Sequence, residues 1–305
     1  MSKLYRLPFY GLLLGVMAVF LSGCHEMVLF KPQGAIAAEQ IRLIIISVIL
    51  MLLIVVPVII MTAVISWRYR ASNKKATYTP DWEHSVKLEA IWWGIPCVII
   101  VILGWITWVT SHTLDPYRPL DSNVKPLTVQ AVSLDWKWLF IYPEQGVATL
   151  NYLEIPENTP ISFEITADAP MNSLWIPALG GQIYSMPGMR TRLHLIAEHV
   201  GEYEGLGANY SGGGFTDMHF KVKSVSQEDF NTWVTSVKQQ TNPLTQEAYD
   251  RLAKPSEDEP VQYFSMVKQG LFNDIMMKFM MPAGMDHHAM SHMSMSMMMP
   301  EQAGE

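Results

Sequence analysis

The chain has 305 residues, of which 50% are hydrophobic and only 16% are charged, and its mean hydropathy is positive. This composition is too apolar for an ordinary soluble protein, and the length suits one membrane unit plus one globular domain. The net charge of -7 and the lack of any lysine- or arginine-rich cluster exclude the electrostatic attraction that nucleic-acid binding requires. The two cysteines, Cys24 and Cys97, lie in apolar segments, so they can build neither a disulfide framework nor a thiolate metal cluster.

Residues 1–23 have the form of a secretory signal peptide. A basic start at Lys3 and Arg6 precedes an apolar run that is too short and too early for a stable membrane span. The run ends at Leu21-Ser22-Gly23-Cys24, which resembles the bacterial lipoprotein cleavage box. That resemblance implies that the Cys24 thiol receives a diacylglyceryl group and becomes the first mature residue, so acyl chains would hold residues 24–42 at the periplasmic surface. The alternative is a chance cysteine that ends an uncleaved helix.

Two uncharged stretches, residues 43–67 and residues 90–111, are each longer than the roughly 20 residues that a helix needs to cross a bilayer core. We expect both to be transmembrane helices. The connecting loop, residues 68–89, is basic, and short loops with excess lysine and arginine stay in the cytoplasm. Both ends of the mature chain are therefore predicted to be periplasmic, in agreement with lipidation at Cys24.

The pattern changes beyond the second span to short alternating runs, such as residues 161–166, separated by Pro, Gly and Asn. It predicts an antiparallel β-sandwich or barrel over residues 125–224. Residues 225–281 show helix-like spacing of apolar side chains and are expected to form a small helical appendage, with helices over residues 227–239, 245–253 and 263–280.

The last segment, residues 282–305, has no periodicity and is rich in methionine, with His287, His288 and His292 among the methionines. Thioether and imidazole groups suit copper, so this tail is a possible copper site. The alternative, which we favour, is a disordered tail without a metal.

Three short sequence motifs in the chain resemble subunit II of the haem-copper oxidases. Residues 87–92, Lys-Leu-Glu-Ala-Ile-Trp, look like the start of that family's second helix. Residues 135–143, Asp-Trp-Lys-Trp-Leu-Phe-Ile-Tyr-Pro, resemble its aromatic-rich segment in the form typical of quinol oxidases, and residues 263–280 resemble the cytochrome bo branch. The resemblance covers residues 24–280 and implies two transmembrane helices followed by an all-β, cupredoxin-like periplasmic domain with a small C-terminal helical appendage.

In the cytochrome c oxidase branch of this family, the cupredoxin domain holds two coppers with a first histidine and a later Cys-x-Glu-x-Cys-x-x-x-His-x-x-Met loop. Bridging thiolates and imidazoles suit a dinuclear copper centre that shares one electron. Aligning this motif preserves every spacing but removes the ligands, which implies a domain without copper. The first histidine is replaced by Asn172, the cysteines by Gly207 and Ser211, the glutamate by Asn209 and the second histidine by Phe215, while Met218 alone is retained.

The resemblance implies subunit II of a proton-pumping ubiquinol oxidase in the bacterial inner membrane. This chain would carry no cofactor, while haems and one copper would lie in subunit I, and its partners would be subunits I, III and IV, membrane lipid and ubiquinol as the substrate of the complex. The rival interpretation is a free-standing periplasmic lipoprotein with a ligand- or copper-handling β-domain. Two tryptophan-rich, proline-containing spans argue against it, because acyl chains at Cys24 would suffice as an anchor.

Glu89 lies where the cytoplasmic loop enters the second span, a depth at which an ionisable side chain is costly and is a candidate for function. The resemblance implies that this carboxylate lies near the entrance of a proton-uptake channel in subunit I. The alternative is a snorkelling residue paired with Lys87 or with a group of subunit I. No catalytic residue is expected in this chain, and Cys97 is interpreted as a small packing residue.

Overall fold

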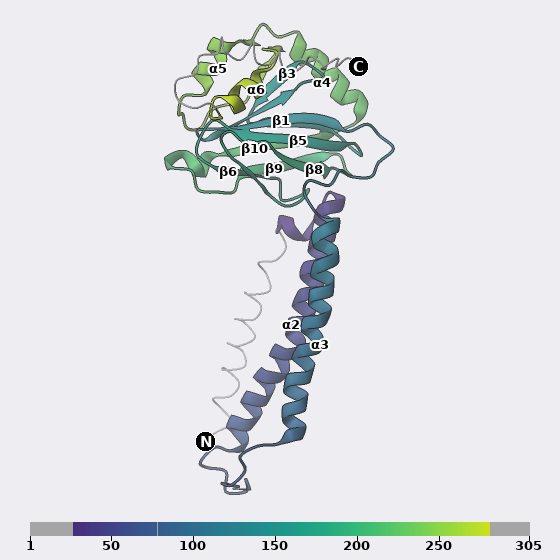
Figure 1. Ribbon diagram of the computed structural model, residues 1–305, viewed down its shortest axis with the longest axis vertical. Coiled ribbons are helices and arrows are strands. Elements are labelled where there is room, and N and C mark those ends of the chain that lie inside the picture. The colour runs from purple at the N-terminus through teal and green to yellow at the C-terminus, as the bar shows by residue number, and fades with distance from the viewer. Residues whose placement is uncertain (1–26, 78, 281–305) are drawn as a thin grey trace, which may run out of the picture.

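The computed structural model describes residues 27–77 and 79–280. The predicted signal peptide, the lipidation site Cys24 and the tail at residues 282–305 lie outside the described residues. Within them, a long helical hairpin carries a β-rich domain at one end (Figure 1). The predicted fold class is confirmed: two helices long and apolar enough to span a membrane precede a β-sandwich domain with a helical appendage.

The hairpin consists of α2 (Ala35–Arg68) and α3 (Val86–Thr113), preceded by the short helix η2 (Val28–Phe30). Both long helices begin before the uncharged stretches, because backbone hydrogen bonding continues through charged residues at the membrane surface. Only Ala37 and Ile41 of α2 and Ile99 of α3 are buried. The rest of the apolar surface is exposed, as expected for a hairpin that faces lipid or other membrane helices.

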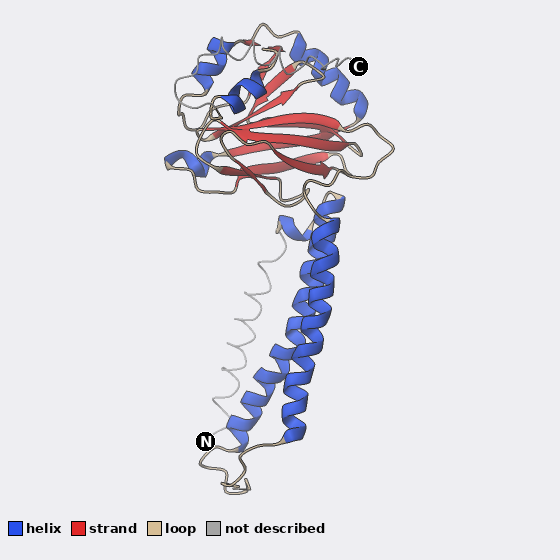
Figure 2. Ribbon diagram, viewed as in Figure 1, coloured by secondary structure: helices blue, strands red, loops and turns tan. Residues whose placement is uncertain are grey.

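The domain is a sandwich of two sheets (Figure 2). The six-stranded sheet has the order β12-β3-β2-β1-β5-β8 and the five-stranded sheet the order β4-β10-β9-β6-β7. Most neighbours are antiparallel, but β1 pairs with β5, and β4 with β10, in parallel. The strands are β1 (Leu127–Leu134), β2 (Lys137–Tyr142), β3 (Val147–Leu150), β4 (Tyr152–Pro156), β5 (Pro160–Ala167), β6 (Asn172–Trp175), β7 (Ile183–Ser185), β8 (Thr191–Ile196), β9 (Gly201–Gly207), β10 (His219–Val225) and β12 (Gln262–Phe264).

The part of the six-stranded sheet around β2 and β3 is buried on both faces, because all six residues of β2 and all four of β3 are buried. The edge strand β8 instead alternates buried residues with exposed or half-buried ones. Successive side chains of a strand point to opposite faces. Trp138, Phe140 and Tyr142 therefore enter the core between the sheets, while Leu139 and Ile141 enter a second core on the other face. This explains why the aromatic-rich segment reads as a continuous apolar run.

The appendage supplies the other side of the second core. It comprises α4 (Gln227–Lys238), β11 (Pro243–Leu244), α5 (Gln246–Leu252), β13 (Met266–Val267) and α6 (Leu271–Met277). Its buried side chains Leu244, Tyr249 and Phe272 pack with Leu139 and Ile141. Helix α4 lies instead over the edge of the first core, with Ser226 accepting a hydrogen bond from the backbone N–H of Asp229 at its N-terminus.

The helix predicted over residues 263–280 is wrong in its first half. Residues Gln262–Phe264 form β12, which pairs antiparallel with β3, and only Leu271–Met277 are helical. The free edge of β3 has unpaired backbone N–H and C=O groups. Residues 262–264 form hydrogen bonds with these groups, so their own backbone groups need no partners within a helix. The alternation that places Phe264 in the second core was the signal for a strand.

The appendage is fastened by Asp168, whose carboxylate is almost fully buried after the end of β5. One oxygen accepts a hydrogen bond from the Tyr249 hydroxyl of α5 at 2.6 Å, and the other accepts from the Lys278 ammonium after α6 at 2.7 Å. Burial raises the pKa of Tyr249, and the hydrogen bond to Asp168 raises it further, so the tyrosine remains a donor at neutral pH. Three distant segments are thereby joined at one point.

The hairpin is fixed to the domain through the segment before α2. The Gln33 N–H donates to the Ala178 carbonyl at 2.8 Å, and the Glu198 N–H donates to the Gln33 carbonyl at 2.9 Å. A Cβ at Gly34 would lie 2.2 Å from the carbonyl oxygen of Ile196, so no larger residue fits where the chain passes the sheet. The domain therefore sits directly on the end of the hairpin (Figure 1).

Candidate functional site

The positions aligned with copper ligands converge at one end of the five-stranded sheet. Asn172 begins β6, Gly207 ends the neighbouring strand β9, and Met218 directly precedes β10. The backbone N–H of Gly207 donates to the Met218 carbonyl at 2.9 Å. Asn172 and Met218 are buried, so the alignment made from spacing alone corresponds to a real cluster in the fold.

The Asn172 amide organises this cluster. Its Nδ2 donates to the Ser211 hydroxyl at 3.0 Å and lies 3.0 Å from the Met218 sulfur, while its Oδ1 accepts from the backbone N–H of Ser173 at 2.7 Å and of Asn209 at 3.4 Å. A buried amide with all these partners carries no desolvation penalty from unmade hydrogen bonds. A neutral polar network thus stands where the related motif has metal ligands.

Gly207 shows how closely the network fills the space. A Cβ added there would lie 2.8 Å from Asn172 Oδ1 and 3.0 Å from Met218 Sδ. A cysteine side chain at this position would collide with the amide unless Asn172 also changed. Gly207 and Asn172 therefore fit each other as a pair.

Phe215 is not part of the network. It lies in the short 3-10 helix η3 (Gly213–Asp217), half-buried, with its ring centroid 5.7 Å from that of Tyr210. Asn209 contributes mainly through its backbone N–H, and its side-chain amide donates to the Met171 carbonyl at 3.2 Å. Five of the six aligned positions therefore meet around the Asn172 amide, and Phe215 flanks them.

Sequence reasoning missed the contribution of Trp136 to this loop. Its indole N–H donates to the Ser211 carbonyl at 3.3 Å, and a Cβ at Gly214 would lie 2.6 Å from its ring. Trp136 has a φ of 61°, an uncommon left-handed conformation for a bulky residue, at the turn between β1 and β2. The aromatic-rich segment drew attention to this residue, but its backbone conformation and its place over the loop depend on the tertiary structure.

The donor set does not fit a dinuclear copper centre. An amide, a hydroxyl and one thioether supply neither the bridging thiolates nor the imidazoles that such a centre requires. In residues 27–77 and 79–280, no three His, Cys, Asp or Glu side chains gather in a way that could hold a metal ion. The network can rigidify the loop, and its groups offer no redox chemistry.

Glu89 lies far from this cluster. It is in the first turn of α3, half-exposed, and its backbone N–H donates to the Ser85 carbonyl at 2.9 Å. Helix α3 has 28 residues and so is about 42 Å long, which puts Glu89 at the end of the hairpin away from the domain. Figure 1 shows that α3 runs from the far end of the hairpin to the sandwich. The two candidate sites are therefore independent.

Comparisons with known proteins give a consistent result. The COX Aromatic Rich Motif family matches residues 238–283, the segment that forms most of the appendage. A Pseudomonas aeruginosa protein named cytochrome bo(3) ubiquinol oxidase subunit 2 is 54% identical over 271 residues, 89% of this chain and 80% of the relative. The Pseudomonas putida protein of that name is 55% identical over 94% of this chain and 88% of its own length. A Bacillus subtilis quinol oxidase subunit 2 is 38% identical over 85% of this chain and 81% of the relative.

Among solved structures, the periplasmic domain of cytochrome oxidase subunit II from Bradyrhizobium japonicum aligns with 39% of this chain and 96% of its own length. The sequence identity is 21% and the TM-score 0.37.

We predict that copper can be introduced into this cluster. The variant Asn172→His, Gly207→Cys, Ser211→Cys and Phe215→His, with Met218 unchanged, restores the sulfur and imidazole ligands at the preserved spacing. Replacing Asn172 also removes the atom that a Gly207 side chain would meet. Because Phe215 is only half-buried, its loss is expected to cost less than the ~3 kcal/mol at the low end for buried rings.

Copper counting and an optical spectrum of the full-length variant would test this prediction, with two coppers and intense thiolate bands as the expected result. The matched control carries Asn172→His, Gly207→Ser and Phe215→His, which gives the same loop without thiols. A folded quadruple variant that binds no copper would show that the alignment of this loop is wrong. Two coppers in the parent chain would overturn the redox-inert interpretation.

Proposed function

This chain belongs to the subunit 2 family of quinol oxidases, and from that membership we propose that it serves a proton-pumping ubiquinol oxidase as a structural subunit without a redox centre of its own. The two Pseudomonas proteins named cytochrome bo(3) ubiquinol oxidase subunit 2 align with 89% and 94% of this chain. Alignments of this length include the membrane hairpin, the sandwich and the appendage. They do not favour the alternative of a free-standing lipoprotein.

The observation that carries the proposal is the amide network at Asn172. A subunit that receives electrons from a soluble cytochrome needs a metal centre in its periplasmic domain, and the donor groups here do not fit one. Electrons from a membrane quinol can instead enter the complex elsewhere. We assign the haems and the single copper to subunit I, where dioxygen would be reduced to water.

The chain is anchored in the membrane by α2 and α3, with the sandwich on the periplasmic side. We propose that its membrane is the bacterial inner membrane, and that subunits I, III and IV cover part of the apolar surface of the hairpin that the chain itself leaves exposed, with lipid on the rest. Cys24 would add acyl chains at the periplasmic end, close in sequence to η2 and the start of α2.

The test of a non-redox subunit is the metal content and donor preference of the purified complex. We expect one copper per complex, oxygen uptake with ubiquinol, and none with reduced cytochrome c. Two further coppers that persist after removal of loosely bound metal and remain with this chain would contradict the proposal. Purification of the tagged chain without any haem-bearing partner would contradict the assignment to an oxidase.

A second prediction concerns Glu89 as a proton-entry carboxylate. Glu89→Gln keeps the size and hydrogen bonding of the side chain but removes its exchangeable proton. We expect quinol oxidase turnover to fall while the haem content stays normal. Glu83→Gln, a change in the exposed loop on the same side of the membrane, is the matched control and should leave turnover unchanged. Turnover of Glu89→Gln within about twofold of the parent at every pH would support the snorkelling alternative.

A third prediction concerns the N-terminus. We expect the mature chain to begin at Cys24 and to carry acyl chains, because the cleavage box ends there. Intact-mass measurement of the purified chain would check both points. The Cys24→Ser variant should lose the lipid mass yet remain in the membrane, since α2 and α3 suffice to hold it. A mature chain that retains residues 1–23 would exclude this processing.

A further inference from the structure

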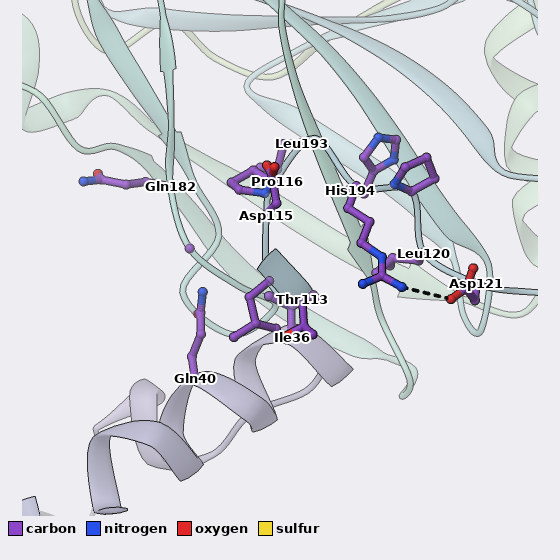
Figure 3. Close-up of a pocket in the computed structure, with 14 residues that line it drawn as sticks. Ile36, Gln40, Thr113, Asp115, Pro116, Leu120, Asp121, Gln182, Leu193 and His194 are labelled. Carbon is purple, nitrogen blue, oxygen red and sulfur yellow. Dashed lines mark ion pairs between the residues drawn. The ribbon is translucent and has the colours of Figure 1, made fainter. Parts of the chain in front are cut away.

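A cavity of about 340 Å³ lies where the hairpin meets the sandwich, and neither the aligned copper positions nor Glu89 is part of it. Figure 3 shows its walls, which come from three parts of the chain. Ile36 and Gln40 of α2 form one side, the linker from Thr113 to Asp121 a second, and Gln182 with His194 of β8 a third. Such convergence of distant segments on one hollow is typical of binding sites.

The depth of this cavity relative to the membrane follows from the ends of the two spans. Gln40 lies three residues before the uncharged stretch of α2, and Thr113 lies two residues after that of α3. At about 1.5 Å per residue, both are within about 5 Å of the hydrocarbon boundary. The head-group layer on each side of a bilayer is roughly 5–7 Å thick. The cavity therefore opens at the level of the lipid head groups on the periplasmic side.

The charged groups of the cavity are of both signs. Arg118 lies 3.7 Å from Asp121, an ion pair drawn in Figure 3, and its guanidinium keeps further donors free because the contact is long and half of the side chain is exposed. Asp115 accepts the N–H of Tyr117 with one oxygen, which leaves the other available. Burial and the nearby Arg192 lower the pKa of His194, so its imidazole is neutral at pH 7.

We propose that this cavity binds the head group of a zwitterionic phospholipid of the outer leaflet, such as phosphatidylethanolamine. Arg118 binds the phosphate, with Gln40, Gln182 and neutral His194 as further hydrogen-bonding groups, while Asp115 and Asp121 bind the ammonium. The acyl chains continue down the exposed apolar surface beside the spans. The proposal rests on the membrane placement of α2 and α3 and not on the redox role of the chain.

The charge balance selects among lipids. Among the charged side chains that line the cavity, the two carboxylates of Asp115 and Asp121 face the one guanidinium of Arg118, while Arg192 lies near His194 outside the lining. An anionic head group without an ammonium would meet the phosphate donor but would bring its negative charge close to Asp115 and Asp121 without supplying a cation for either, which opposes its binding. A zwitterionic head group supplies a partner for each sign of charge.

The test uses the intact complex with two photoreactive probes, phosphatidylethanolamine and phosphatidylglycerol, each carrying a diazirine in the acyl chain near the ester. Cross-linked peptides are mapped by mass spectrometry. We expect labelling of residues 113–121 and 181–194 by phosphatidylethanolamine, several-fold above that by phosphatidylglycerol. Arg118→Gln should lower this labelling about tenfold, because one charge-assisted hydrogen bond is lost, while Arg118→Lys should retain most of it.

Arg42→Gln is the matched control. Arg42 pairs with Glu39 three residues before it, as Arg118 pairs with Asp121 three residues after it, and it lies at the same end of the hairpin but does not line the cavity. It should leave labelling of the cavity peptides unchanged.

Three outcomes would overturn the proposal: equal labelling by the two lipids, an equal loss in Arg42→Gln and Arg118→Gln, or no labelling of these peptides by either lipid. The comparison of the two probes needs only the parent complex, so it decides the proposal even where a variant fails to assemble. Haem content and quinol oxidase turnover are measured in parallel. They test the proposed function, while the labelling tests lipid binding, so the failure of one can be distinguished from the failure of the other.

Discussion

Burial of β2 and β3 on both faces of the six-stranded sheet is the constraint on which the rest of the domain depends. One face packs on the second sheet and the other on the appendage, so β2 is apolar at nearly every position. A sheet of this kind would expose a large apolar surface if the appendage were absent. The segment that matches the COX Aromatic Rich Motif family is therefore part of the fold of the domain and not a peripheral extension.

The same sheet also positions the loop after β9, residues 208–218, which aligns with the copper-binding motif. Trp136 follows β1 at the turn into β2, and its indole lies over the loop that contains Ser211. Directly after it, the buried ammonium of Lys137 donates to the carbonyl of Lys254 at 2.8 Å and so ties the turn to the appendage. With the loop held by Trp136 from outside and by the Asn172 amide from within, its shape does not require a metal ion.

The two ends of the hairpin have different roles. Glu89 is in the first turn of α3, at the end of the hairpin away from the domain, and the proton-entry role proposed for it depends on groups of other subunits. At the periplasmic end, the close passage of Gly34 beside Ile196 holds the domain against the helices. The proposed lipid site lies at the same junction, between Ile36 and Gln40 of α2 and His194 of β8.

The sequence by itself determined the features that depend on local composition and spacing. The length of the uncharged stretches located both spans. The alternation of apolar and polar residues located the sandwich at residues 125–224, and strands β1 to β10 run from Leu127 to Val225. The spacing of the copper motif located a loop whose residues do not suit copper. Only the tertiary structure decided what depends on a distant partner. Residues 262–264 became a strand because β3 offered a free edge, and the Asn172 amide found distant partners in the loop that follows β9. Hydrogen-bond partners and cavities arise from segments far apart in the chain, and no local period encodes them.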